Sequence, residues 1–313
     1  MDKSCYERIR EAAADGALPE DFRMAKAPEG GLSFADGALD GITLYHRAPG
    51  HELSEAQKAL IARAIQQISD GDFYDAEETV WQIAGEIGAL DAHGDLQRCI
   101  CENAQSLQLG NIVNFAFALA TQSPNPAVVK LVLSMLSPFS LGEDGKEVIR
   151  TLGLSDEFTL FAAINMQSWD NSNNEWFNLA RRVRGWGRIH LIDRLQPQTE
   201  EIRRWLLVEG VHNSVMPAYS ALDCWMKADV PAVLKGVPDK QALNGVRDIL
   251  LGLLDEGPVR GISAIEDAEA HILAFLEREG ATALDDEDRS AIADIREHFS
   301  ENMAILHACD ALL

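Results

Sequence analysis

The sequence predicts an all-α protein, built as an α-α superhelix of the HEAT or armadillo kind with an irregular N-terminal arm. Three observations support this fold class. From Leu53 onward, apolar residues recur at helical spacing in one short segment after another. The links between segments are brief, and no part of the chain after residue 50 shows the sustained alternation that is typical of a strand. A short motif also repeats at an offset of 45 to 46 residues.

The repeated motif has two copies. Residues 114–118 resemble residues 160–164, and Thr121-Gln122-Ser123 resembles Met166-Gln167-Ser168. An asparagine-containing turn follows each copy. HEAT and armadillo repeats have periods of about 40–47 residues. The two copies therefore favour a solenoid of stacked helices over a single bundle.

Residues 1–50 are expected to form an N-terminal part that packs on the repeats. A first helix covers residues 4–14. Glycine and proline are then dense from residue 17 to residue 50, and glycine at this density discourages helix. We expect an irregular arm here, with a short hairpin that turns at Asp36-Gly37 or at Asp40-Gly41.

Residues 51–313 are expected to form one continuous helical-repeat domain. Ser54 is an N-cap for its first helix and Asp75 for its second. The acidic residues 285–288 stand at a helix start, where the helix dipole favours negative charge, and we expect a solvated first turn there. Further helices are expected over residues 95–108, 111–122, 126–136, 144–152, 156–167, 173–184, 188–195, 200–209, 214–228, 239–254, 261–278, 285–299 and 302–312.

The formal net charge is -23 at pH 7. A chain this acidic repels nucleic acid and anionic membranes at long range, and it favours basic partners. A membrane span needs about 20 mainly apolar residues in one helix. The uncharged run over residues 103–129 does not meet this need, because Pro124 and Pro126 divide it. We therefore expect no membrane association.

The five cysteines are odd in number and low in density. The charged, amphipathic start of the sequence is expected to form a helix rather than a secretory signal. Reduced thiols and a cytoplasmic location are expected. Cys99 and Cys101 lie two positions apart on an expected helix, so their side chains point about 200° apart and cannot meet at one ion. The chain contains no Gly-rich phosphate loop, His-Glu-x-x-His or Gly-x-Ser-x-Gly motif. We expect no metal site and no cofactor, and we assign no catalytic residue.

The most unusual stretch runs from Trp169 to Trp225 and contains five of the six tryptophans. Residues 175–204 hold seven arginines and four acidic residues, a local charge of +3 that leaves -26 for the remainder. Gly185 is expected to end a helix in the left-handed conformation, and Gly187 permits a second bend. Trp186 is thereby placed between two glycines.

Two explanations of this basic island stay open. The arginines can pair with carboxylates and helix C-terminal carbonyls of adjacent repeats, which would be purely structural. They can instead form a site for an anion or an acidic peptide, with a tryptophan as a stacking wall. The candidate ligand- or partner-binding residues are Trp169, Asp170, Asn174, Arg181, Arg184, Trp186, Arg188 and His190.

A resemblance to a known family falls within the same stretch. Residues 185–190, 201–210 and 213–217 resemble an uncharacterised bacterial all-helical repeat family, some of whose relatives carry a limonene hydroxylase label. The resemblance implies a helical-repeat fold rather than an activity. The chain shows no haem-ligand context, flavin loop or iron triad.

Three functions follow, from different classes. The first is a non-catalytic binding scaffold that presents a concave surface of stacked helices to a protein or peptide partner, and the lack of catalytic motifs favours it. The second is a small-ligand-binding protein or an enzyme, with a pocket around Trp186. The third resembles the HEAT-like DNA glycosylases, and the net charge of -23 argues against it.

Overall fold

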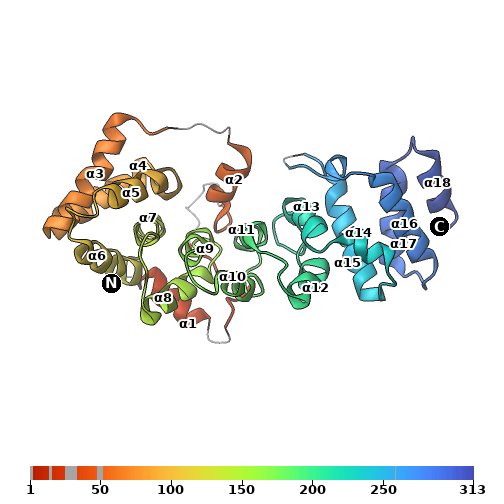
Figure 1. The fold of residues 1–313 in the computed structure, drawn as a ribbon, viewed down its shortest axis with the longest axis horizontal. Coiled ribbons are helices and arrows are strands. Elements are labelled where there is room, and N and C mark those ends of the chain that lie inside the picture. Colours follow the sequence, from red (N-terminus) through yellow and green to blue (C-terminus); the bar gives the residue numbers. More distant parts are fainter. Residues whose placement is uncertain (1–2, 14–15, 25–33, 48–51, 258) are drawn as a thin grey trace. The chain divides into compact units, whose positions relative to one another are not determined.

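The computed structural model describes residues 3–13, 16–24, 34–47, 52–257 and 259–313. Within these ranges the protein is all-helical, with eighteen α-helices, one short 3-10 helix and no strand (Figure 1). The all-α prediction is confirmed. None of the helices in the described ranges has both the length and the apolar character that a membrane crossing requires.

Packing divides the chain into two compact units, Met1–Leu191 and Ile192–Leu313. The division falls inside α11 (Trp186–Arg194). The other helices of the first unit are α1 (Cys5–Ala12), α2 (Ala38–His46), α3 (Glu55–Asp70), α4 (Phe73–Glu86), α5 (Ala89–Glu102), α6 (Leu109–Gln122), α7 (Pro126–Leu136), α8 (Glu143–Gly153), α9 (Thr159–Met166) and α10 (Ser172–Ala180). The second unit contains α12 (Glu200–Val208), α13 (Ala218–Lys227), α14 (Val230–Lys235), α15 (Lys240–Leu254), η1 (Ile262–Ala264), α16 (Ala268–Gly280), α17 (Asp286–His298) and α18 (Met303–Asp310).

The core of the first unit is built around α7, which packs against α4, α5, α6 and α9. Every residue from 128 to 136 is buried. The side chain of Asn125 accepts a hydrogen bond from the Ala127 amide, and Pro126 occupies the first turn, where its missing N–H costs nothing. The helix has the predicted bounds. Lys130 is the one charged residue of this buried helix, at 8% exposure.

The core of the second unit is built around α15, which packs against α12, α13, α16 and α17. Asp239 caps α15 by accepting a hydrogen bond from the Ala242 amide. Gly245 permits a close helix approach, because a Cβ there would lie 2.3 Å from the Leu207 carbonyl oxygen. Arg247 is the buried cation of this helix.

The prediction of a hairpin in the N-terminal arm is wrong, because residues 38–46 form α2. Gly37 lies just before this helix at φ 75°, in the left-handed region that favours glycine. Gly41 lies inside the helix, and a Cβ there would lie 2.1 Å from a ring carbon of Trp186. The two glycines therefore mark a helix start and a close contact, not a turn.

Several predicted helix starts are also wrong. Asp75 is not an N-cap, because it lies inside α4, whose N-cap position is Asp72. The helix expected over residues 261–278 is α16, which begins at Ala268 after the short η1. The helix expected over residues 95–108 is α5, which begins at Ala89, directly after Gly88 at φ 84°. The helix expected from residue 214 begins at Ala218. Asn213 instead accepts hydrogen bonds from the amides of Val215 and Met216, so it shapes the turn that precedes the helix.

The acidic residues at the start of α17 are not simply a solvated first turn. Asp285 caps the helix, but the Asp288 side chain is fully buried. Lys240 approaches one oxygen of Asp288 at 2.5 Å, and Arg247 approaches the other at 2.9 Å. The sequence pattern missed this burial because both cations come from α15, more than one helix away in the chain.

Candidate functional site

Trp169 is buried and lies next to two cations. Lys146 Nζ and Arg150 Cζ each lie 5.2 Å from the centre of a Trp169 ring, within the range of a cation–π interaction. Arg150 also pairs with both carboxylate oxygens of Glu175, at 3.0 and 2.8 Å. Both cations belong to α8, so the stacking partner of Trp169 is not one of the predicted arginines. The neighbouring predicted residues, Asp170 and Asn174, are exposed.

Two of the predicted arginines lie on the surface with separate partners. Arg181 lies over the Phe177 ring, 4.6 Å from its centre, and donates to Asn178. Arg184 forms an ion pair with Glu20 of the N-terminal arm. The two arginines therefore do not converge on one site, because each contacts different residues of the first unit.

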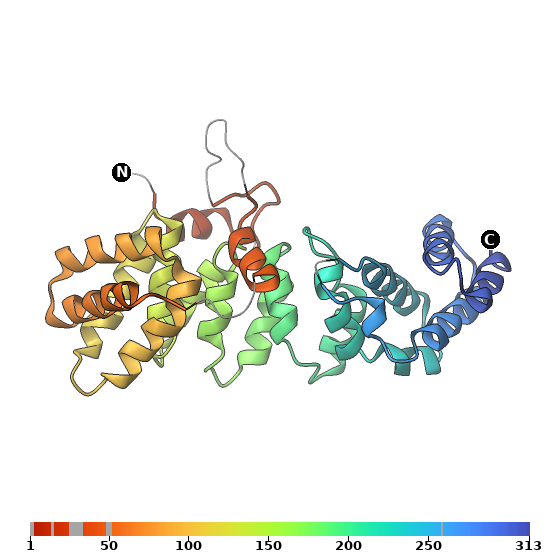
Figure 2. The same cartoon turned by 90° about the horizontal axis from the view of Figure 1, so that it is seen from above.

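Trp186 is 4% exposed and contacts Gly41 of the arm helix α2. Figure 2 shows the orange ribbon of α2 beside the green helices of the first unit. The Tyr45 ring centre is 6.0 Å from that of Trp186 and 6.1 Å from that of His190, and the Trp186 and His190 rings are 6.2 Å apart. The structure thus brings two predicted residues together, with a tyrosine from α2 as the third ring. Arg188 is buried near them and donates to the Val183 carbonyl at 2.9 Å.

Ion pairs and hydrogen bonds fasten α2 to the first unit. Lys130 Nζ lies 2.6 Å from Asp40 of α2 and 2.5 Å from Glu157. The other Glu157 oxygen accepts a hydrogen bond from the Gly37 amide at 2.7 Å. Arg47 pairs with Asp91. The surface around Trp186, where the sequence predicts a ligand, is occupied by the protein's own helix.

The turn before α11 is built on Asp156. Its Oδ1 accepts hydrogen bonds from the amides of Gly185, at 3.0 Å, and Gly187, at 2.7 Å. Gly185 does not adopt the predicted left-handed conformation. Both glycines serve close approach instead, because a Cβ at residue 187 would lie 2.4 Å from Thr159 Oγ1 and one at residue 185 would lie 3.1 Å from the Asp156 carboxyl.

This turn makes the stability of the first unit depend on pH. Burial raises the pKa of Asp156 to about 6, although the hydrogen bonds from Gly187 and Gly185 act in the opposite direction. A carboxyl with a folded-state pKa above its unfolded value of about 3.9 stabilises the fold when protonated. That contribution is complete below about pH 4 and is lost as the pH rises through 6.

Asp156→Asn is therefore expected to stabilise the protein at pH 7.5, by about 1–3 kcal/mol, because asparagine keeps the acceptor oxygen without the buried charge. Urea denaturation at pH 7.5 and pH 4.5 measures the effect, which should largely vanish at the lower pH. Asp170→Asn is the control, since Asp170 is exposed. An equal loss of stability at both pH values would mean that the turn needs the carboxylate.

An exposed stripe on α4 was missed by the sequence reasoning. Tyr74 is 79% exposed and Trp81 is 42% exposed, whereas four of the other tryptophans are buried and Trp205 is half-buried. The two aromatic residues are seven positions apart and share one side of the helix. Glu77 and Glu78 lie between them and are exposed. We call these four residues the α4 stripe.

A signal for the stripe is present in the sequence. Val80 and Ile83 mark the buried side of α4. Tyr74 and Trp81 fall outside that side, on a part of the helix otherwise occupied by glutamate. An aromatic pair at i, i+7 opposite the core face therefore indicates a contact surface, which the concentration of tryptophans after residue 169 obscured.

Within the described ranges, no three histidine, cysteine or acidic side chains are placed to hold a metal ion. Comparisons with known protein families, with curated proteins and with solved structures find no match.

Proposed function

We propose that this protein is a non-catalytic scaffold of HEAT or armadillo-like helical repeats, which presents a concave surface to a protein or peptide partner with a basic segment. The observation that carries the proposal is the α4 stripe. The repeated motif at residues 114–123 and 160–168 supports the solenoid. The resemblance to the bacterial all-helical family and a cytoplasmic location belong to the same proposal.

The chemistry of the α4 stripe suits a basic partner. Large aromatic side chains are enriched among residues that dominate binding energies, and soluble proteins rarely leave them exposed together. Tyr74 and Trp81 are about 10 Å apart along the helix axis, so one short segment can contact both. A lysine or arginine of that segment can lie over the Trp81 ring and reach Glu77 or Glu78. The net charge of -23 attracts such a segment at long range.

The contacts around Trp186 favour the function of a binding scaffold over that of a small-ligand-binding protein with a pocket at Trp186. A small ligand at Trp186 must first displace α2, together with the Lys130–Asp40 ion pair. The α4 stripe needs no such rearrangement, because its side chains are already exposed.

The test uses the full chain and two designed helical peptides, one of leucine and lysine and one in which glutamate replaces lysine. The basic peptide should bind and change the emission of Trp81, and the acidic peptide should not. Trp81→Ala should weaken binding by about 2 kcal/mol or more, roughly thirtyfold in Kd. Glu77→Gln with Glu78→Gln should weaken it further and reduce its salt dependence. Fluorescence anisotropy of the labelled peptides measures the affinity of the unmodified chain and of both variants.

The control must separate the stripe from the general acidity of the chain. Glu277→Gln with Asp294→Asn removes two exposed charges from the second unit and should leave the affinity nearly unchanged. If this control weakens binding as much as the Glu77 and Glu78 variant does, the peptide responds to net charge alone and the assignment of the stripe is wrong.

A further inference from the structure

The second unit contains a pocket, separate from the α4 stripe of the first unit. Its volume is about 500 Å³, within the range of about 300–1,000 Å³ that is usual for small-molecule sites. The pocket lies between the turn before α13, the side of α15 and the start of α17. Its lining consists of Val211, His212, Pro217, Ala218, Arg247, Asp248, Leu251, Gly252, Asp255 and Glu287.

One part of the lining is apolar. Val211, Ala218 and Gly252 are buried, and Leu251 is half-buried. Gly252 allows α15 to pack closely against α13, since a Cβ there would lie 3.0 Å from the Ala221 Cβ. This part of the pocket can receive a hydrocarbon group and exclude water from it.

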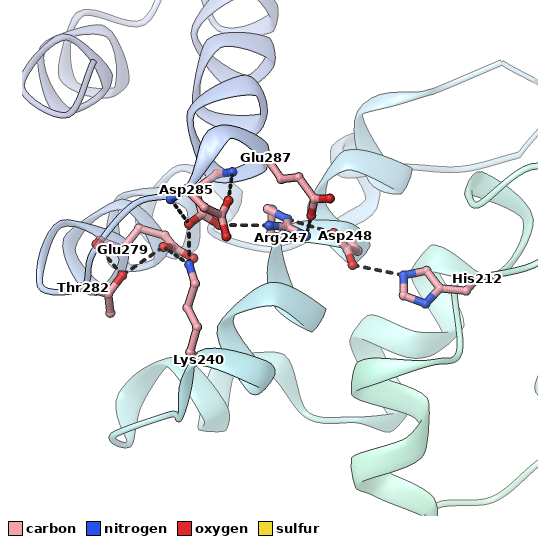
Figure 3. Close-up of polar contacts among 9 residues, drawn as sticks. His212, Lys240, Arg247, Asp248, Glu279, Thr282, Asp285 and Glu287 are labelled. Atoms are coloured by element: carbon pink, nitrogen blue, oxygen red, sulfur yellow. Dashed lines mark hydrogen bonds and ion pairs between the residues drawn. The ribbon is translucent and has the colours of Figure 1, made fainter.

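The other part of the lining is polar and centred on Arg247, which is buried to 5% exposure (Figure 3). Its Nε donates to Asp248 at 2.9 Å, one terminal nitrogen donates to Asp288 at 2.9 Å, and the other donates to Glu287 at 3.0 Å. Because each of the three nitrogens already donates to a carboxylate, the charge of the guanidinium is offset by its own neighbours and attracts an anion only weakly.

His212 extends this network at the mouth of the pocket. Its Nε2 lies 3.0 Å from the second oxygen of Asp248. Burial acts to raise the pKa of Asp248, but the hydrogen bonds from His212 and Arg247 outweigh it and hold that pKa below its usual value. Asp248 is therefore a fixed negative charge at neutral pH.

The lining carries more negative than positive charge. Asp248, Asp255 and Glu287 give three carboxylates, whereas Arg247 and the imidazole of His212 are the only basic side chains of the lining, so the carboxylates outnumber them. The Asp255 carboxylate has no ion pair or hydrogen bond with another described residue, and Glu287 is largely exposed with only one oxygen bound to Arg247. Behind the wall, Lys240 is already shared by Asp288 and Glu279. A positively charged group entering the pocket thus meets Asp255, which has no cationic partner among the described residues, and the free oxygen of Glu287.

We propose that this pocket binds a small organic cation, an amine or guanidinium attached to an apolar body. The cationic group lies between Asp255 and Glu287, with Asp248 behind them, and the apolar body lies against Val211, Leu251 and Gly252. The charge of the wall excludes carboxylates and phosphates, and the apolar side discriminates against bare metal ions.

Three compounds of similar shape test the proposal on the full chain: 2-phenylethylamine, the neutral 2-phenylethanol and the anionic 3-phenylpropionate. Calorimetry and protein NMR should show that the amine binds at least about tenfold more tightly than the alcohol, and that the anion does not bind. Amine binding should weaken as salt is raised. Resonances of residues in α13, α15 and the start of α17 should shift, and those of α4 should not.

Asp255→Asn with Glu287→Gln should weaken binding of the amine by about tenfold or more, since each substitution keeps the shape and removes a charge. The matched control, Glu266→Gln with Asp286→Asn, removes two exposed charges of the same unit outside the lining and should leave the affinity unchanged. Equal binding of amine and alcohol, no binding of the amine at millimolar concentration, or an equal loss in the control variant would each overturn the proposal.

Discussion

Lys130→Met is expected to lower the free energy of unfolding of the first unit by about 3–5 kcal/mol, because it leaves two carboxylates without their cation in a buried setting. Lys130 Nζ lies 2.6 Å from Asp40 and 2.5 Å from Glu157. Burial acts to lower the pKa of Lys130, but these two acids outweigh it and raise that pKa, so the ammonium is charged at neutral pH. Hydrogen exchange of α7 and α9 under native conditions measures the loss.

The matched control is Lys3→Met, since Lys3 pairs with Glu11 in an exposed setting where ion pairs contribute little. A second variant separates burial from charge. Lys130→Met with Asp40→Asn and Glu157→Gln should recover much of the lost stability, because no buried charge is then left unpaired. If the triple variant is as unstable as the single one, packing of the lysine stem rather than its charge holds α2 in place.

Arg247→Met is expected to have an effect of similar size, about 3–5 kcal/mol, in the second unit. The change removes one of the two cations that face the fully buried Asp288, and it releases Asp248 and Glu287. Exchange protection should fall in α15 and α17 and persist in α7, which belongs to the other unit.

Arg296→Met is the control for this change, because Arg296 pairs with Asp310 where both side chains are about half exposed. Arg247→Lys should recover only part of the loss, since one ammonium cannot reproduce the three separate hydrogen bonds of the guanidinium. A full recovery by lysine would show that charge alone, without the fork geometry, stabilises the start of α17.

In both units, cations of a central buried helix pair with carboxylates that are distant in the chain. Lys130 of α7 binds acids at positions 40 and 157, and Arg247 of α15 binds acids at positions 287 and 288. Lys130 therefore holds α2 against α7, and Arg247 holds the start of α17 against α15. The loss of stability on removing either cation comes mainly from the buried carboxylates that are left unpaired, rather than from the lost attraction itself.

The helical character of the chain was predictable because it depends on local spacing. The bounds of α7 follow from Asn125, Pro126 and a continuous apolar run, all within one short stretch. Helices with weaker local signals were misplaced. Gly88 starts α5 in a conformation that requires a glycine, and the spacing of apolar residues does not report it.

The candidate site was predicted less well, because its partners are distant in the sequence. Trp169 does meet cations, but from α8, where Lys146 and Arg150 are four positions apart and share one side of the helix. Nothing near Trp186 indicates that Gly41 will lie against its ring. The sequence pattern indicates a turn at Gly41, whereas the fold uses the small size of this glycine.

The contact between Gly41 and Trp186 also has a consequence for synthesis on the ribosome. Residue 41 is made roughly 145 residues before the ring that covers it. At about 5–20 residues per second, α2 waits roughly 7–30 s for its binding surface. During that interval Leu39 and Ile42 remain exposed, as they do in the finished fold, but Ala38 and Tyr45 are exposed as well. A nascent chain stalled before residue 186 is therefore expected to recruit a chaperone at α2, and one stalled well beyond it is not.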